Sequence, residues 1–316
     1  MAITFLVSSV VEAGPGKPAG AVAVSGASGL LGSALLPALR AAGWTPRALV
    51  RRAAGPGEVR WDPAAGTLDF TDLAGVHTAV HLAGESIAAG RWTADTKRRI
   101  RDSRVLGTRL LSESLALLPH PPRVLVSASA VGIYGDRGDE LLDEDSPLGS
   151  DFLAGVGKEW EAATAPATEA GIRVVHLRLG VILAREGGAL PRMVRPFLLG
   201  AGGPIGNGRQ WMSWITLDDA VAAILEVLRN EDAGGPINTV APEPVRNADF
   251  AARLGEVLHR PALIPAPAFA LRLLFGEMAD AALLASQRVI PSRLGALGFR
   301  FRYPTLVGAL HAILGR

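Results

Sequence analysis

The sequence predicts an α/β fold in which helices cover both faces of a doubly wound parallel sheet. Short apolar segments alternate, up to Gly180, with longer segments that show the 3.6-residue periodicity of helices. A glycine-rich turn joins the first strand segment directly to the first helical one, as Gly26-Ala-Ser-Gly29-Leu-Leu-Gly32. Parallel strands need long crossover connections, so this alternation predicts a parallel sheet of the Rossmann type.

The expected elements follow from periodicity and from turn residues. Strands are expected over 21–24, 46–50, 59–61, 68–70, 79–82, 123–127 and 174–179, and helices over 30–42, 93–118 and 159–170. Beyond Gly180 the pattern loosens and indicates a strand-to-helix step over 214–228, then helices over 248–259, 268–286 and 304–314.

Three parts of the chain are expected. Residues 1–19 form an N-terminal appendage and linker, because an alternating β-branched segment suited to a strand precedes a stretch rich in Gly and Pro. Residues 20–186 form the nucleotide-binding core, and residues 187–316 form a smaller C-terminal substrate lobe, part of which returns to the core sheet.

Composition excludes several classes of protein. The net charge is only +2, and no basic cluster is interleaved with aromatic residues, so no nucleic-acid partner is expected. No apolar run reaches the roughly 18 residues that a membrane span needs, and we expect a cytoplasmic protein. Without cysteine there is no disulfide or thiolate nucleophile, and the six histidines lack zinc-site spacing, so no metal is expected. A small molecule is the expected partner; its identity and the oligomeric state do not follow from the sequence.

Each glycine of the turn has a physical reason to be there. Gly26 permits the tight turn, Gly29 lets the backbone approach a pyrophosphate, and Gly32 allows the helix to pack closely on the strand. The start of the helix presents free N–H groups to the phosphates. The predicted dinucleotide-binding residues are therefore Gly26, Ser28, Gly29, Leu30, Leu31 and Gly32. A tight turn without a ligand is the alternative.

The residues after the second strand indicate which dinucleotide binds. Enzymes that use NAD present an acidic residue there to the ribose hydroxyls. This chain presents Arg51 and Arg52, which would form charge-assisted hydrogen bonds with a 2′-phosphate and so predict NADP(H). The alternative is a pair of solvated surface arginines.

The buried strand over 79–82 ends in a second candidate binding segment. Small residues at Ala83 and Gly84, after Leu82, would keep the backbone close to the adenine and its ribose. His81 is interpreted as a core residue and not as a catalytic one.

Several longer motifs occur along the chain: His81-Leu-Ala-Gly-Glu85, Arg91-Trp92, Ser103-Arg104, Ser127-Ala-Ser-Ala-Val-Gly-Ile-Tyr-Gly135, Lys158-Glu-Trp-Glu161, Gly187-Gly188, Pro196–Gln210, Trp214-Ile-Thr-Leu-Asp-Asp219, Gln287–Leu294 and Gly298-Phe-Arg-Phe301. Together they resemble the short-chain dehydrogenase/reductase superfamily in its extended or atypical branch. Within that superfamily the chain is similar, over about residues 21–314, to the group named epimerase family, which is related to the nucleoside-diphosphate-sugar epimerases.

The resemblance implies further roles. Glu85 and Arg104 would lie at the cofactor, and Ile182 would border the nicotinamide, although Arg104 could instead be one more charge on a helix surface. The substrate would be a small carbonyl or hydroxyl compound or a sugar nucleotide.

The usual catalytic unit is incomplete. Related enzymes use a Ser or Thr and a Tyr-x-x-x-Lys unit as proton relay. Lys158 is present, but Ala154 stands where the tyrosine belongs. Tyr134 is the candidate substitute, with Ser129 as hydrogen-bond donor if the alignment slips by one residue; without the slip the serine position falls on Ala130.

Other interpretations of these residues stay open. Ser127 and Ser129 could simply close a strand end, and Lys158 could be a helix-surface residue. The protein could also have lost redox chemistry and use the nucleotide as a structural or sensory ligand.

The glycine-rich segment 200–208 and the residues after it are the candidate substrate cleft. Gln210, Trp211 and Trp214 are the predicted substrate residues, because long loops that combine glycine and tryptophan often carry function. Alternatively, the tryptophans pack the second lobe against the sheet.

Overall fold

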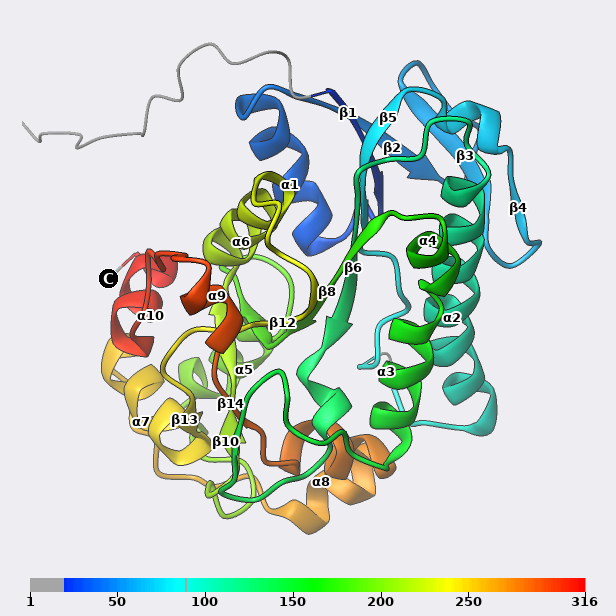
Figure 1. Ribbon diagram of the computed structural model, residues 1–316. Helices are drawn as coiled ribbons and strands as arrows, with labels where there is room; N and C mark the ends of the chain where they lie inside the picture. Colours follow the sequence, from blue (N-terminus) through cyan, green and yellow to red (C-terminus); the bar gives the residue numbers. More distant parts are fainter. Residues whose placement is uncertain (1–19, 89, 316) are drawn as a thin grey trace, which may run out of the picture.

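A single mostly parallel sheet runs through the molecule, and helices lie on both of its faces (Figure 1). The computed structural model describes residues 20–88 and 90–315, so the strand expected near the N-terminus lies outside the described residues. The strand order is β12-β8-β6-β5-β1-β2-β3-β4, in which only β4 pairs antiparallel. The bounds are β1 Gly20–Ser25, β2 Trp44–Val50, β3 Glu58–Asp62, β4 Thr67–Leu68, β5 Val76–His81, β6 Val124–Ala130, β8 Arg173–Leu179 and β12 Gly235–Thr239. The predicted doubly wound sheet is confirmed.

Each face of the sheet buries its own apolar cluster. On one face, α1 (Leu30–Ala41) and α6 (Leu217–Arg229) pack against β1, β8 and β12. On the other, α2 (Ala94–Ala116) and α4 (Ala165–Glu169) cover β3, β5 and β6, and α3 (Phe152–Ala162) packs against α2 and β6. Helices on both faces make the strands inaccessible from either side, so a ligand can reach them only at their ends.

Chain segments after residue 186 contribute to both parts of the molecule. The helix α6 and the strand β12 belong to the central sheet layer, although they come late in the sequence. The remaining segments form the C-terminal lobe, whose core is a third apolar cluster around Trp214. Its elements are α5 Leu190–Leu198, β10 Trp211–Met212, β11 Trp214–Thr216, β13 Val245–Arg246, α7 Asn247–Leu258, α8 Ala268–Phe275, η3 Ala279–Leu284, β14 Arg288–Val289, α9 Ser292–Ala296 and α10 Leu306–Leu314. The strand β9 Val181–Leu183 comes before residue 186 and joins the lobe by pairing with β11.

Three expected elements differ from the structure, each for a local reason. The helix expected over 159–170 is two helices, α3 and α4, with Pro166 in the first turn of the second. The helix expected over 268–286 ends at Gly276, which has φ +61°. Phe70, expected in a strand, instead begins the 3₁₀ turn η1 (Phe70–Leu73), because the Asp69 carboxylate accepts a hydrogen bond from the Thr71 amide.

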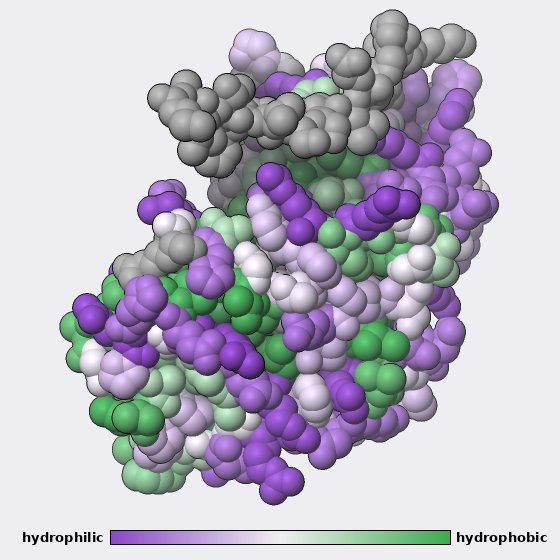
Figure 2. Space-filling view, turned by 90° about the vertical axis from the view of Figure 1, so that its left-hand side faces the viewer, coloured by the Kyte–Doolittle hydropathy of each residue, from purple (hydrophilic) through white to green (hydrophobic). Residues whose placement is uncertain are grey.

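The surface is of mixed polarity. On the face shown in Figure 2, apolar areas are interspersed among hydrophilic ones. Within the described residues, every helix is too short or too polar to cross a membrane. Larger exposed apolar side chains gather on α8, where Phe269 and Leu273 are each 73% exposed.

His81 gives the fold a pH dependence that can be measured. Burial lowers the pKa of its imidazole from 6.5 to about 4. The folded protein therefore keeps His81 neutral while the unfolded chain takes up a proton, so stability is complete above pH 6.5 and falls as the pH drops toward 4. We expect a loss of about 3 kcal/mol from this group. Denaturant titrations across this range should show the loss, and the His81 ring should stay neutral by NMR at pH 5; a ring that titrates near 6.5 contradicts the expectation.

Candidate cofactor and substrate site

The glycine turn between β1 and α1 brings three backbone segments into close contact. Gly26 adopts φ +67°, a left-handed conformation, and a Cβ there would lie 2.7 Å from the carbonyl carbon of Leu82. A Cβ on Gly32 would lie 2.2 Å from the Gly26 carbonyl oxygen. Both positions therefore require glycine, for the turn and for helix–strand packing respectively.

The start of α1 is built to receive an anion. Gly29 is the N-cap, no side chain caps the helix, and its first turn carries no acidic residue. A Cβ on Gly29 would meet only the Gly26 carbonyl oxygen, at 3.2 Å, so the surface beside it is open. Uncapped amide groups at a helix N-terminus attract negative charge, and Ser28 and Gly29 are exposed beside them. These residues fit the pyrophosphate of a dinucleotide.

A buried polar contact joins the ends of β1 and β5 beneath this turn. The Ser25 hydroxyl oxygen lies 2.6 Å from His81 Nδ1 and accepts hydrogen bonds from the amides of Leu82, at 3.2 Å, and Ala83, at 3.4 Å. The His81 ring is buried and packs edge-on against Trp61. As expected from the sequence, His81 is a core residue; it supports the segment from Leu82 to Gly84.

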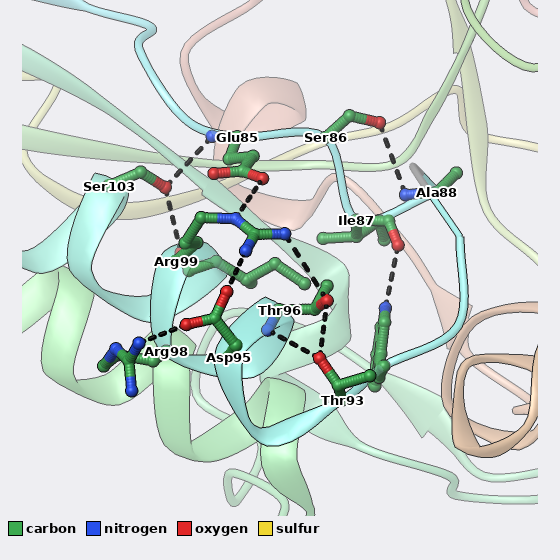
Figure 3. A network of polar contacts seen from close by, with 12 residues as sticks. Glu85, Ser86, Ile87, Ala88, Thr93, Asp95, Thr96, Arg98, Arg99 and Ser103 are labelled. Carbon is green, nitrogen blue, oxygen red and sulfur yellow. Dashed lines mark hydrogen bonds and ion pairs between the residues drawn. The ribbon is translucent and has the colours of Figure 1, made fainter.

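The segment after β5 is held against α2 by a polar network (Figure 3). The Glu85 amide donates to the Ser103 hydroxyl at 3.0 Å, and Arg99 Nε donates to the Glu85 carboxylate at 3.1 Å. Arg99 also pairs with Asp95 on its own helix. The backbone of Glu85 is thereby fixed at the carboxyl end of the sheet.

Arg104 lies at the same sheet edge. Its Nη1 donates to the carbonyl oxygens of Glu85 and Ile100, both at 3.0 Å, and its guanidinium stacks on Trp160. A Cβ on Gly84 would lie 3.4 Å from this guanidinium, so glycine leaves it room. Desolvation lowers the pKa of Arg104 to about 10, and the group still carries its charge at neutral pH. A half-buried cation bonded only to backbone carbonyls is suited to an anionic ligand.

The two arginines after β2 differ in their surroundings. Arg52 donates to both carboxylate oxygens of Glu58, at 2.6 and 2.7 Å, and to the Ala53 carbonyl. The hydrogen bonds from Arg52, and then that from the Gly55 amide, lower the pKa of Glu58 to about 2. The Arg51 guanidinium is exposed and has no partner among the described residues, so it is the freer of the two to bind a phosphate.

Ile182, which the resemblance implies would border the nicotinamide, lies near the glycine turn. It pairs with Ile215 across β9 and β11. A Cβ on Gly188 would lie 3.4 Å from the Ile182 carbonyl oxygen and 2.9 Å from Leu30 Cδ2. The structure thus brings Leu30, Ile182 and Gly188 together.

Tyr134 is not placed as a proton relay, which corrects that expectation. Its side chain is fully buried at the end of η2 (Val131–Tyr134). The hydroxyl donates to Asn238 Oδ1 at 2.7 Å and accepts from Arg178 Nη1 at 2.9 Å. Burial raises the pKa of the phenol, although the charge of Arg178 acts against this. This hydroxyl is buried in the core and both of its hydrogen bonds are formed. It cannot reach a substrate unless the core rearranges.

Ser129 and Lys158 lie in different environments: the Ser129 side chain is buried, whereas the Lys158 side chain is exposed. The buried Ser129 hydroxyl donates to Glu161 Oε1 at 2.7 Å, beneath α3, and so does not face the sheet edge. Lys158 is exposed, with no hydrogen-bond or ion-pair partner among residues 20–88 and 90–315. Ala154 is fully buried, whereas Ala130 is exposed at the end of β6. The expected catalytic set of Tyr134, Lys158 and Ser129 is therefore not assembled.

Trp214, one of the three expected substrate residues, lies in the core, which corrects the expectation for it. Gln210 lines a cavity of the C-terminal lobe. Trp214 is fully buried and its indole N–H donates to the Glu243 carbonyl at 2.8 Å. The buried Gln210 amide donates to the carbonyls of Ile205 and Leu283, both at 3.1 Å. Trp211 is half-buried, and its indole N–H donates to Asp139 Oδ1 at 2.8 Å.

Sequence reasoning missed the polar group that occupies the strand ends. Arg178 pairs with both oxygens of Glu161 at 2.9 Å, and Ser129 and Asn238 lie on either side of it in register. Burial acts to lower the pKa of Arg178, but Glu161 outweighs it and raises the pKa. The sequence does contain a signal for this buried ion pair, because Arg178 stands inside the otherwise apolar strand segment Val174-Val-His-Leu-Arg-Leu179.

Comparison with known proteins agrees with this geometry. The profile described as NAD dependent epimerase/dehydratase family matches residues 22–240, which is more than half of the chain. The chain belongs to this family. A domain of unknown function, DUF1731, matches residues 266–313, where the sequence motifs indicated a family-specific C-terminal segment.

Individual relatives span nearly the whole chain. An epimerase family protein of Mycobacterium bovis is 44% identical over 290 residues, which cover 92% of this chain and 96% of the relative. The crystal structure of human epimerase family protein SDR39U1 with NADPH has a TM-score of 0.85 at 34% identity, covering 94% of this chain and 99% of that one. A nucleoside-diphosphate sugar epimerase of Corynebacterium glutamicum has a TM-score of 0.79 at 40% identity, covering 93% and 58%. The resemblance inferred from the motifs is confirmed.

Gly29→Val should abolish binding of both NADPH and NADH while leaving the protein folded. The branched side chain would fill the open surface beside the uncapped amides of α1, and Gly29 already has an extended backbone that valine accepts. Calorimetry would measure binding, and circular dichroism the fold. Gly295→Val on α9, where a Cβ meets no other atom within 4 Å, is the control. Unchanged affinity in a folded Gly29 variant means that the phosphates bind elsewhere.

Tyr134→Phe should destabilise the protein by about 1–3 kcal/mol, because Asn238 Oδ1 loses its buried donor and Arg178 Nη1 keeps only the Glu144 carbonyl, at 3.2 Å. Urea unfolding would measure the loss. Tyr303→Phe, at the only other tyrosine, is the control, since the Tyr303 hydroxyl has no hydrogen-bond partner among the described residues. Equal stability of both variants would show that the buried hydroxyl contributes nothing.

Proposed function

We propose that this chain is an NADP(H)-dependent oxidoreductase or epimerase that acts on a small carbonyl or hydroxyl compound, sugar nucleotides included. The observation that carries the proposal is the uncapped N-terminus of α1 behind the left-handed Gly26 turn, with a free Arg51 at the end of the next strand. A helix start of this kind binds a pyrophosphate, and a free guanidinium there suits a 2′-phosphate.

The residues that would hold the cofactor come from four strand ends. Ser28 to Gly32 would bind the pyrophosphate, Arg51 and Arg52 the 2′-phosphate, and Leu82 to Glu85 the adenosine; Arg104 and Ile182 would border the nicotinamide half. When bound, the nicotinamide supplies or accepts a hydride. The NADPH in the crystal structure of the human relative supports the choice of cofactor.

Arg52 would act as a fixed phosphate ligand and Arg51 as an adaptable one. Glu58 holds the Arg52 guanidinium in one orientation, so little side-chain entropy is lost when it binds. The same carboxylate reduces the net positive charge beside the phosphate, which makes the unpaired Arg51 the larger electrostatic contributor.

The proton for a carbonyl reduction would come from a different source than in related enzymes. Ala130 and Ala154 stand at the serine and tyrosine positions, and the Tyr134 hydroxyl is sealed in the core. Lys158 is the one member of the usual set with an exposed ionisable side chain. We assign to it hydrogen bonds to a ribose hydroxyl or to the substrate oxygen, with solvent as the proton source.

A second function, dinucleotide binding without turnover, is favoured by one specific observation. The Tyr134 hydroxyl is buried and bonded to Arg178 and Asn238, so it does not face the sheet edge. To separate the two functions, the NADPH-loaded protein is incubated with a panel of carbonyl compounds and NADPH absorbance is followed. Consumption that Lys158→Met reduces supports the enzyme; no consumption on any substrate supports the regulatory function.

Arg51→Ala should weaken NADPH binding at least tenfold and leave NADH binding within about twofold. A lost hydrogen bond to a charged group costs about 1.5–3 kcal/mol, and NADH lacks the phosphate. Arg52→Ala should also weaken NADPH binding more than NADH binding. Arg40→Ala, at the opposite end of α1, is the control. Equal losses for the two dinucleotides, measured by calorimetry, would refute the assignment of these arginines to the 2′-phosphate.

A further inference from the structure

The helix α8 is apolar along almost its whole length, yet it is not buried. Its sequence is Ala-Phe-Ala-Leu-Arg-Leu-Leu-Phe and it contains no buried residue. Each of the other helices in the part of the chain that the structure describes contains at least one. Phe269 and Leu273 lie one turn apart on the same exposed side, and Leu274 beside them is also exposed. A helix of this composition is normally buried against another element.

Two neighbouring segments extend this apolar helix face. Leu263, which precedes α8, and Leu199, which follows α5, are 81% and 84% exposed, and next to them Ile264 and Leu198 are about half exposed. The Ile264 amide donates to the Gly202 carbonyl at 3.0 Å, so the chain after α5 is joined to the chain before α8. The term α8 surface is used below for these seven residues: Leu198, Leu199, Leu263, Ile264, Phe269, Leu273 and Leu274.

The extent of the α8 surface indicates a protein partner. With about 150–200 Å² for each large apolar residue, its members together expose on the order of 800 Å². The largest apolar patch on a typical monomeric protein is about 300–600 Å². One side of a standard protein–protein interface buries about 800 Å². The α8 surface therefore exposes more apolar area than a monomer usually leaves in water, and its extent is that of one side of an interface.

The helix α8 is fixed to the rest of the molecule at both of its ends. After the helix, the Glu277 carboxylate pairs with Lys97 of α2, which belongs to the nucleotide-binding core. Before the helix, Ala266 forms two backbone hydrogen bonds with the segment 204–206, both at 2.8 Å. A surface that is already held in place loses little conformational entropy when a partner binds.

Charges of opposite sign lie at the two ends of the α8 surface. Arg195 stands one turn before Leu199 and Arg260 three residues before Leu263; both are exposed and have no hydrogen-bond or ion-pair partner among residues 20–88 and 90–315. At the other end, after α8, lie the carboxylates of Glu277 and Asp280. A two-fold axis through α8 would bring the arginines of one copy of the chain to the carboxylates of the other.

We propose that the α8 surface is the interface of a symmetric homodimer, in which α8 of one copy packs antiparallel against α8 of its partner. A two-fold interface needs a surface that is complementary to itself, and an apolar centre with opposite charges at its two ends meets this need. An anionic membrane fits less well, because it would repel Glu277 and Asp280, and the single basic residue of α8, Arg272, is already paired with Asp280. The proposal does not depend on the proposed function.

Sedimentation equilibrium of the full chain tests the proposal, and we expect twice the mass of one chain. Phe269→Asp should weaken self-association about a hundredfold or more, because the symmetry places the substitution in the interface twice. Leu117→Asp, at a residue 65% exposed at the end of α2, is the matched control and should leave self-association unchanged. Circular dichroism and urea unfolding would establish that both variants fold.

A chemical cross-link gives a second, independent measurement. The chain contains no cysteine, so a single introduced one reports its own position. A short bismaleimide should join Leu273→Cys chains in pairs and leave Leu117→Cys chains single on denaturing gels. A full chain that stays monomeric up to about 100 µM, a dimer that Phe269→Asp leaves intact, or equal cross-linking of the two cysteine variants overturns the proposal. Flotation of a monomeric chain with phosphatidylglycerol vesicles, lost in Phe269→Asp, overturns it in favour of a lipid surface.

Discussion

The approach of the Gly26 turn to the end of β5 is the contact on which the rest of the structure depends. Gly26 lies against the Leu82 backbone, and Gly32 lies against the Gly26 carbonyl, at distances that no side chain allows. This contact aims α1 so that its first amides face outward from the sheet edge. The hydrogen bond between Ser25 and His81 joins the ends of β1 and β5 beneath the turn. The segment up to Glu85 is held against α2. The glycine turn and the segment from Leu82 to Glu85 take their positions from this junction.

A second constraint operates where β6, β8 and β12 end. There the chain places an ion pair, Arg178 with Glu161, with Ser129, Tyr134 and Asn238 bonded around it. Removing charges from water is costly, and such a group is stable only when its hydrogen bonds are satisfied. Most of its polar atoms are paired within the group. The network therefore rigidifies the sheet edge, and it uses the same polar side chains that a proton relay would need.

The sequence predicted the features that depend on local pattern. Periodicity located the core strands and helices, and the glycine spacing located the turn, because each glycine answers a backbone constraint within a few residues. What it did not predict depends on contacts between distant segments. Tyr134 faces Asn238, 104 residues away, and Trp214 faces the Glu243 carbonyl inside the C-terminal lobe. The pairing of Arg52 with Glu58 joins residues only six apart, but it depends on the register of β2 on β3, which periodicity does not specify.

The burial of Ala154 has a consequence for how this chain could change over evolutionary time. Its methyl group is fully covered inside the packing of α3. A tyrosine introduced there would have to displace its neighbours, and such overpacking costs roughly 1–3 kcal/mol or more. A single Ala154→Tyr substitution would therefore strain the packing of α3, since no space for a ring is left there. Accepting a tyrosine at this position would require coordinated changes among the side chains that pack against α3.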